Sequence, residues 1–180
     1  MARFSVATIA VCAALAVGLA QAWMPQAWMP QAWKPQAWAA SQSDVVGTWS
    51  FVSNTANQGG TITELFGPGG KGRMVLGADG RYMIVIVRAD LPKLASGNRF
   101  AGTTEENKAV VQGSNAHFGT YAVDASGSTL VFRIEGATFA NWDGAEQKRA
   151  FTVAGDQLKY TIPTSTTGSG PGEVVWKRMK

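Results

Sequence analysis

The residues of the sequence best suited to contact a ligand are a pair of polar residues that alternate with apolar ones along residues 146–153. Gln147 and Arg149 share one face of an expected strand with Phe151 and Val153, because residues two apart project to the same side of a strand. If that face is turned inward, a carboxamide and a guanidinium enter the interior, where a charge must be paired or hydrogen-bonded. Both side chains are then candidates for anchoring a ligand.

Two other placements of these residues stay open. Both side chains can face solvent, since arginine is seldom buried without a partner. Arg149 can also plug the core against Glu105 or Glu135, which belong to an expected helix and an expected strand. The residue pattern does not separate these placements from a cavity-lining one.

Four further residues are candidate ligand contacts. Arg88 closes an apolar run on the same face as Tyr82, so it could lie at a cavity mouth and bind a carboxylate. Tyr82 and Tyr121 each carry a phenol, which needs a hydrogen-bond partner when it is buried. Trp142 lies in a turn-forming Asn-Trp-Asp-Gly segment and could cap a barrel or stack on a ligand. Packing or solvent exposure is the simpler role for each of them.

The sequence offers few candidate catalytic residues. His117, the single histidine, is expected between the helix and the next strand, and as a general base it needs an orienting partner such as Glu105 or Glu106. His117 and Arg149 are only weak catalytic candidates, because the sequence contains no P-loop, dinucleotide fingerprint, nucleophile elbow or zinc-protease motif. With one cysteine and one histidine, no ordinary metal site forms, and no metal or cofactor is expected.

The elements that must hold these residues are mostly strands. Asp79-Gly80 predicts a tight hairpin, because Asp-Gly readily adopts the positive φ of a type I′ turn. Only residues 103–112 look helical, with Thr103 and Glu106 forming a capping box before Gly113. We predict an all-β fold, an antiparallel up-and-down β-barrel of about eight strands with one short helix. The expected strands are residues 45–53, 61–66, 72–78, 81–88, 118–124, 128–136, 146–153, 157–163 and 173–180.

The first 40 residues differ from the rest. Residues 1–22 combine a basic residue, an apolar run and a small-x-small end, which is typical of a signal peptide, although an uncleaved anchor is the alternative. Residues 23–40 continue a Gln-Ala-Trp-Met-Pro repeat, interpreted as a linker or else an interfacial tether. The barrel domain is then residues 41–180, secreted or periplasmic, with no membrane span in the mature form.

Charge argues against a nucleic-acid partner. The 180-residue chain has a formal net charge of +4, but Arg3 and Lys34 lie in the first 40 residues, which contain no acid. The remaining residues include 14 basic and 12 acidic ones, and the two kinds alternate without forming a basic stripe.

Several motifs, in order along residues 44–180, resemble the lipocalin-like domain family of bacteria and fungi, which has a calycin-type barrel. The resemblance implies that Arg178 from the last strand covers Trp49 from the first at the closed end, with Gly47 and Trp176 in the same motifs. Other matching segments are Asp79-Gly80-Arg81-Tyr82-Met83, Gly119-Thr120-Tyr121-Ala122-Val123 and Asn141-Trp142-x-Gly144-x-x-Gln147-x-Arg149.

Such a barrel implies a binding function and no particular reaction. We expect an exported protein that binds a small hydrophobic molecule in an apolar lumen, held by Tyr82, Arg88, Tyr121, Trp142, Gln147 and Arg149. The alternative is a cofactor-independent isomerase or cyclase acting on an apolar substrate in the same cavity. Without a recognisable acid–base pair, binding is favoured over catalysis. The oligomeric state does not follow from the sequence.

Overall fold

The computed structural model describes residues 40–167 and 170–180. The expected signal peptide and nearly all of the repeat lie outside these residues. The described part contains two α-helices, α1 (Gln42–Val45) and α2 (Thr104–Gly113), and one short 3-10 helix, η3 (Ala140–Trp142). Its strands are β1 (Gly47–Gln58), β2 (Thr61–Glu64), β3 (Lys71–Leu76), β4 (Arg81–Val87), β5 (Ser114–Val123), β6 (Thr129–Ala137), β7 (Glu146–Ala154), β8 (Gln157–Ile162) and β9 (Gly172–Arg178).

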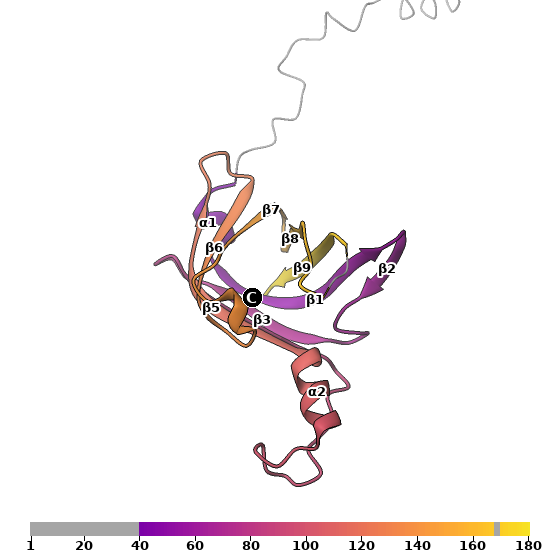
Figure 1. The fold of residues 1–180 in the computed structure, drawn as a ribbon. Coiled ribbons are helices and arrows are strands. Elements are labelled where there is room, and N and C mark those ends of the chain that lie inside the picture. Colours follow the sequence, from indigo (N-terminus) through magenta and orange to yellow (C-terminus); the bar gives the residue numbers. More distant parts are fainter. Residues whose placement is uncertain (1–39, 168–169) are drawn as a thin grey trace, which may run out of the picture. The chain divides into compact units, whose positions relative to one another are not determined.

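The strands form a closed antiparallel barrel. Each strand from β3 to β9 pairs with its neighbour in sequence, and β1 pairs with both β3 and β9, so that eight strands close into a ring (Figure 1). β2 is an additional strand that pairs only with the end of β1. The predicted up-and-down barrel with one main helix is therefore confirmed, and closure leaves few unpaired strand edges.

Local sequence explains most of these elements. The predicted hairpin between β3 and β4 is present, and Gly80 adopts a φ of +79° in its turn. The turn is not the expected type I′, because that type needs a positive φ at both central residues and Asp79 does not have one. The Thr103 hydroxyl accepts a hydrogen bond from the Glu106 amide, and the Glu106 carboxylate accepts one from the Thr103 amide. The capping box that starts α2 is therefore present.

Most element boundaries differ from the prediction by one or more residues, and two of these differences change the local structure. Val45 is not the first residue of a strand but the last of the unpredicted helix α1, whose four residues are too few to produce a visible periodicity. β5 begins at Ser114, directly after α2, rather than at Phe118. The expected loop between helix and strand does not exist, which changes the surroundings of His117.

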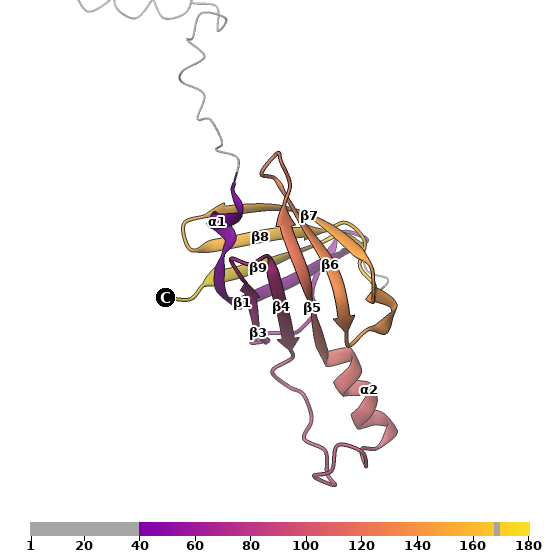
Figure 2. The same ribbon diagram turned by 90° about the vertical axis from the view of Figure 1, so that its left-hand side faces the viewer.

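The two ends of the barrel are built differently, and Figure 2 shows α1 at one of them and α2 at the other. At the α1 end, the Arg178 guanidinium lies 4.1 Å from the centre of the Trp49 ring, the contact that the resemblance implies. The same guanidinium donates hydrogen bonds to the carbonyl oxygens of Val46 (2.6 Å) and Asp44, while the Trp49 indole donates to the Val45 carbonyl (2.9 Å). These contacts tie α1 across the closed end of the barrel.

Gly47 and Trp176 belong to the same arrangement. A Cβ at Gly47 would lie 2.9 Å from the Arg178 guanidinium, so a side chain there would displace the arginine. Trp176 is fully buried and makes an edge-to-face contact with Phe51, with ring centres 5.5 Å apart. The closed half of the barrel is therefore filled by large side chains.

Candidate ligand-binding site

The open end of the barrel is hollowed into a cavity of about 640 Å³. Its walls come from the end of β1, the segment after β2, the end of α2, the start of β5, η3, the first half of β7 and the segment after β8. Apolar side chains form much of the wall, namely Leu65, Phe66, Phe139, Trp142, Ile162 and Pro163. A second, inner cavity of about 30 Å³ shares Asn54, Asn115, Trp142, Gln147, Arg149 and Ile162 with the outer one.

The inner cavity is small because core side chains fill the barrel beneath it. Its remaining lining residues are Ile84, Ile86, His117, Phe132, Tyr160 and Val174. A volume of about 30 Å³ accommodates about one water molecule. An elongated ligand must therefore lie in the outer cavity, and only a small group can reach the inner one.

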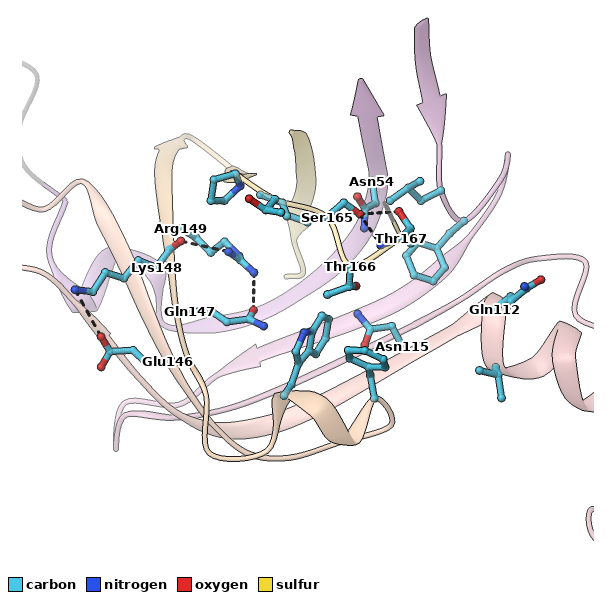
Figure 3. A pocket seen from close by; sticks show the side chains of 18 residues that line it. Asn54, Gln112, Asn115, Glu146, Gln147, Lys148, Arg149, Ser165, Thr166 and Thr167 are labelled. Atoms are coloured by element: carbon cyan, nitrogen blue, oxygen red, sulfur yellow. Dashed lines mark hydrogen bonds and ion pairs between the residues drawn. The ribbon is translucent and has the colours of Figure 1, made fainter. Parts of the chain in front are cut away.

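Gln147 and Arg149 lie on the floor between the two cavities. Both side chains face inward from β7, as the alternation with the buried Phe151 allows, and Figure 3 shows them pointing into the shared space with Asn115. The Arg149 guanidinium donates to the Gln147 carboxamide oxygen at 2.6 Å and to the Lys148 carbonyl at 3.3 Å. The solvent-facing placement left open by the sequence does not occur.

Arg149 has no carboxylate partner among the described residues. Glu105 and Glu135 are exposed, and neither lies within ion-pair distance of its guanidinium. Glu146 also lines the outer cavity, but its carboxylate is paired with Arg133 (3.1 Å) and Lys148 (3.6 Å), and Figure 3 shows the Glu146–Lys148 pair apart from Arg149. Burial lowers the pKa of Arg149. Its charge is therefore uncompensated within the cavity.

His117 is buried, contrary to the expectation of a loop residue. It projects inward from β5 with 7% of its surface exposed, and its Nδ1 lies 2.9 Å from the Tyr82 hydroxyl. Burial, together with the nearby Arg149 cation, lowers the pKa of His117 to about 4, so the ring is neutral at neutral pH. Burial also raises the pKa of Tyr82. Neither group is charged near neutral pH.

Edge-to-face ring contacts connect the mouth of the cavity to its floor. Phe139 and Trp142 have ring centres 5.6 Å apart, Trp142 and His117 5.4 Å apart, and His117 and Tyr82 5.4 Å apart. Tyr82 then contacts Phe132 at 4.7 Å. This packing explains how η3 is fixed against the barrel, because Trp142 inserts between the loop and the floor.

Asn54 is a site residue that the strand pattern missed. Trp49 and Phe51 face inward on β1, so simple alternation would turn Asn54 outward, but a β-bulge between Phe51 and Ser53 shifts the register. Asn54 is 5% exposed, and its carboxamide oxygen has no hydrogen-bond partner among the described residues. A buried oxygen without a partner is costly, which indicates that water or a ligand satisfies it.

The other predicted contacts lie elsewhere. Tyr121 projects towards the closed end, where its hydroxyl donates to the Gly77 carbonyl at 2.8 Å. Arg88 follows β4 and forms an exposed bidentate pair with Asp90 at 2.8 and 2.9 Å. Neither residue lines the two cavities, whereas Trp142, Gln147 and Arg149 line both, and Tyr82 contacts the lining residue His117.

In the described ranges, no group of three or more His, Cys, Asp or Glu side chains is arranged to hold a metal ion. No helix in these ranges is long and apolar enough to span a bilayer.

A closed antiparallel barrel of eight strands, with one end tied by a tryptophan–arginine stack and the other hollowed, defines the lipocalin type of β-barrel. A family model described as a lipocalin-like domain matches residues 46–179, and the chain belongs to this family. No match was found among curated proteins.

Proposed function

We propose that the protein binds a small hydrophobic molecule in the outer cavity of the barrel. The observation that carries this proposal is the cavity itself, whose volume of about 640 Å³ lies within the range of small-molecule sites. Apolar surface predominates in its wall. Four of its polar residues, Asn54, Asn115, Gln147 and Arg149, also line the inner cavity and so lie at the floor, whereas others, such as Gln112 and Thr164, line the outer cavity alone. This combination suits a ligand whose body is apolar and whose orientation is set by one polar end.

Binding accounts for the site better than an isomerase or cyclase reaction does. Among the described residues, the Tyr82–His117 hydrogen bond is the one arrangement that resembles an acid–base pair. Proton transfer is efficient when the pKa of the catalytic group lies near the working pH, but the pKa of His117 is lowered to about 4 and that of Tyr82 is raised. We therefore propose that this pair is structural and adds no charge of its own to the floor beside Arg149.

We also propose that the barrel acts outside the cytoplasm, as a secreted or periplasmic protein. The support is the pattern of residues 1–22, with its basic start, apolar run and small-x-small end. After cleavage there, the chain would contain no cysteine, because Cys12 is the only one. Its stability would then rest on the packed barrel rather than on disulfides.

Filling the cavity tests the binding function. Ile162 lines both cavities, and we expect Ile162→Trp to weaken binding of the neutral probe Nile red by at least about tenfold, because the indole occupies the ligand's volume. Binding is measured by fluorescence titration, and the thermal midpoint is measured alongside to show that the barrel remains folded.

The matched control is Ile62→Trp, since Ile62 lies on β2 with 65% of its surface exposed. This variant should bind Nile red as the wild type does. Equal affinity in Ile162→Trp and wild type, with both proteins folded, would show that the probe binds elsewhere and would refute the cavity as the site.

A further inference from the structure

The most informative feature of the cavity is a cation that no carboxylate of the described residues neutralises. The floor holds the Arg149 guanidinium, and its hydrogen bonds go to the neutral oxygens of Gln147 and Lys148. A charge removed from water is costly unless a counter-charge or several hydrogen bonds replace its hydration. In the described ranges no carboxylate pairs with Arg149, so an opposite charge must come from solvent or from a bound molecule.

The other groups around Arg149 do not compete for that role. On β7, the Glu146 carboxylate pairs with Lys148 and with Arg133. On β4, β5 and β8, the neighbours are Tyr82, the neutral His117 and Tyr160, and none is anionic near neutral pH because burial raises the pKa of both phenols. The net charge presented at the floor is therefore positive.

A second observation marks the same floor as incomplete. The Asn54 carboxamide, 5% exposed, lines both cavities and has no hydrogen-bond partner for its oxygen among the described residues. Arg149 and Asn54 thus enter one space from β7 and β1, on strands far apart in sequence. Together they offer a planar donor fork and an amide that can donate or accept.

Cavity shape fixes the orientation of the occupant. The inner cavity, at about 30 Å³, holds no more than a small polar group or a water molecule, whereas the outer cavity has apolar walls formed by Leu65, Phe66, Phe139 and Ile162. A polar head therefore fits at the floor and an apolar tail fits towards the mouth.

We propose that the ligand is a small amphipathic anion, a carboxylate on an apolar body, which binds head-first with its carboxylate on the Arg149 guanidinium. This inference rests on the proposed function and narrows it to one class of ligand. Arginine and a carboxylate match as two parallel hydrogen bonds, which gives direction as well as affinity. A water molecule in the inner cavity would donate one hydrogen to the carboxylate head and the other to the Asn54 carboxamide oxygen, so that both acceptors are satisfied.

The test compares three probes with the same ten-carbon tail, namely decanoate, decanol and decyltrimethylammonium. Isothermal titration of the wild-type protein near neutral pH should show decanoate binding at least about tenfold more tightly than decanol, and the ammonium compound most weakly. This comparison needs no variant, so it does not depend on whether a substituted barrel folds.

A matched pair of variants then assigns the preference to Arg149. Arg149→Gln should weaken decanoate binding by about 10–100-fold and change decanol binding by less than about threefold. Arg81→Gln removes the same charge from a side chain that is 82% exposed beside the closed end, and it should leave both affinities unchanged.

The outcomes separate the two proposals. If decanol binds, Ile162→Trp abolishes that binding, and decanoate shows no advantage, the cavity function stands and the carboxylate inference is overturned. Equal losses of decanoate affinity in Arg149→Gln and Arg81→Gln also overturn the inference. If neither decanoate nor decanol binds to the wild type, the proposed function fails with it.

Discussion

Replacing Trp49 by alanine is expected to lower the free energy of unfolding by about 3–5 kcal/mol, the usual cost of removing a large aromatic side chain from a packed core. Trp49 is fully buried, and two contacts depend on its ring and indole N–H. The Arg178 guanidinium stacks on it, its N–H donates to the Val45 carbonyl, and α1 is held against the barrel through both. The substitution would leave a cavity and release α1 together.

Chemical denaturation followed by circular dichroism measures this effect. Tryptophan fluorescence is less suitable, because four of the seven tryptophans lie in the repeat of residues 21–39. Trp142→Ala is the matched control, since Trp142 is partly exposed at the ligand cavity. It should cost less stability than Trp49→Ala but should weaken Nile red binding. A Trp49→Ala protein that loses ligand affinity while keeping its unfolding free energy would contradict the assignment of Trp49 to barrel closure.

The second large effect is a loss of stability on mild acidification, caused by the single histidine. The pKa of His117 is about 4 in the folded barrel because burial and Arg149 disfavour its cation, whereas an unfolded histidine titrates near its ordinary value of 6.5. Between these two values the unfolded chain binds a proton that the folded chain does not. The free energy of unfolding therefore falls as the pH falls, by about 2 kcal/mol from about pH 7 to pH 5.

The chosen pH window isolates His117. Other described groups with a shifted pKa in the acid range are carboxyls whose pKa is lowered, so they titrate below the window; they are Asp44, Asp90, Glu106, Asp124 and Glu146. The variant His117→Gln keeps a polar partner for the Tyr82 hydroxyl but removes the titration. Urea unfolding of both proteins should give a falling stability for the wild type and a nearly constant one for His117→Gln. The same slope in both would place the proton uptake elsewhere.

Short-range sequence signals predicted the parts of the fold that depend on neighbouring residues. The Asp79-Gly80 turn needs a positive φ, and the Thr103–Glu106 box satisfies the amides at a helix start, so both are visible in a few residues. Alternation placed Gln147, Arg149 and Phe151 on one face of β7, because no bulge interrupts them, but it left open whether that face is turned inward. The contribution of β7 to the floor of the site was therefore partly predictable from the sequence.

The rest of the site depends on features that the alternation of polar and apolar residues does not predict. Asn54 points inward only because the bulge near Ser53 shifts the register of β1. No residue type in this segment predicts the bulge. His117 is buried because β5 starts directly after α2, four residues earlier than the β-rich run suggests. The cavity wall also depends on the segment after β8 and on η3, which fold over the open end and have no strand pattern.

The floor also refines the expectation of an apolar lumen. Asn54, His117, Gln147 and Arg149 all enter the interior, although apolar surface predominates in the wall of the outer cavity. A cavity that only stored apolar molecules would gain nothing from a buried cation, because burying that charge costs free energy. The arrangement is therefore better explained by recognition of one end of the ligand.

Native mass spectrometry of the protein purified from cells that export it tests the central claim most directly. We expect a population of the barrel to carry one small molecule, released on collisional activation, and the Ile162→Trp variant to lack it. A barrel that is always empty, that binds no added decanoate or Nile red, and whose behaviour Ile162→Trp leaves unchanged would contradict a ligand-binding function for the cavity.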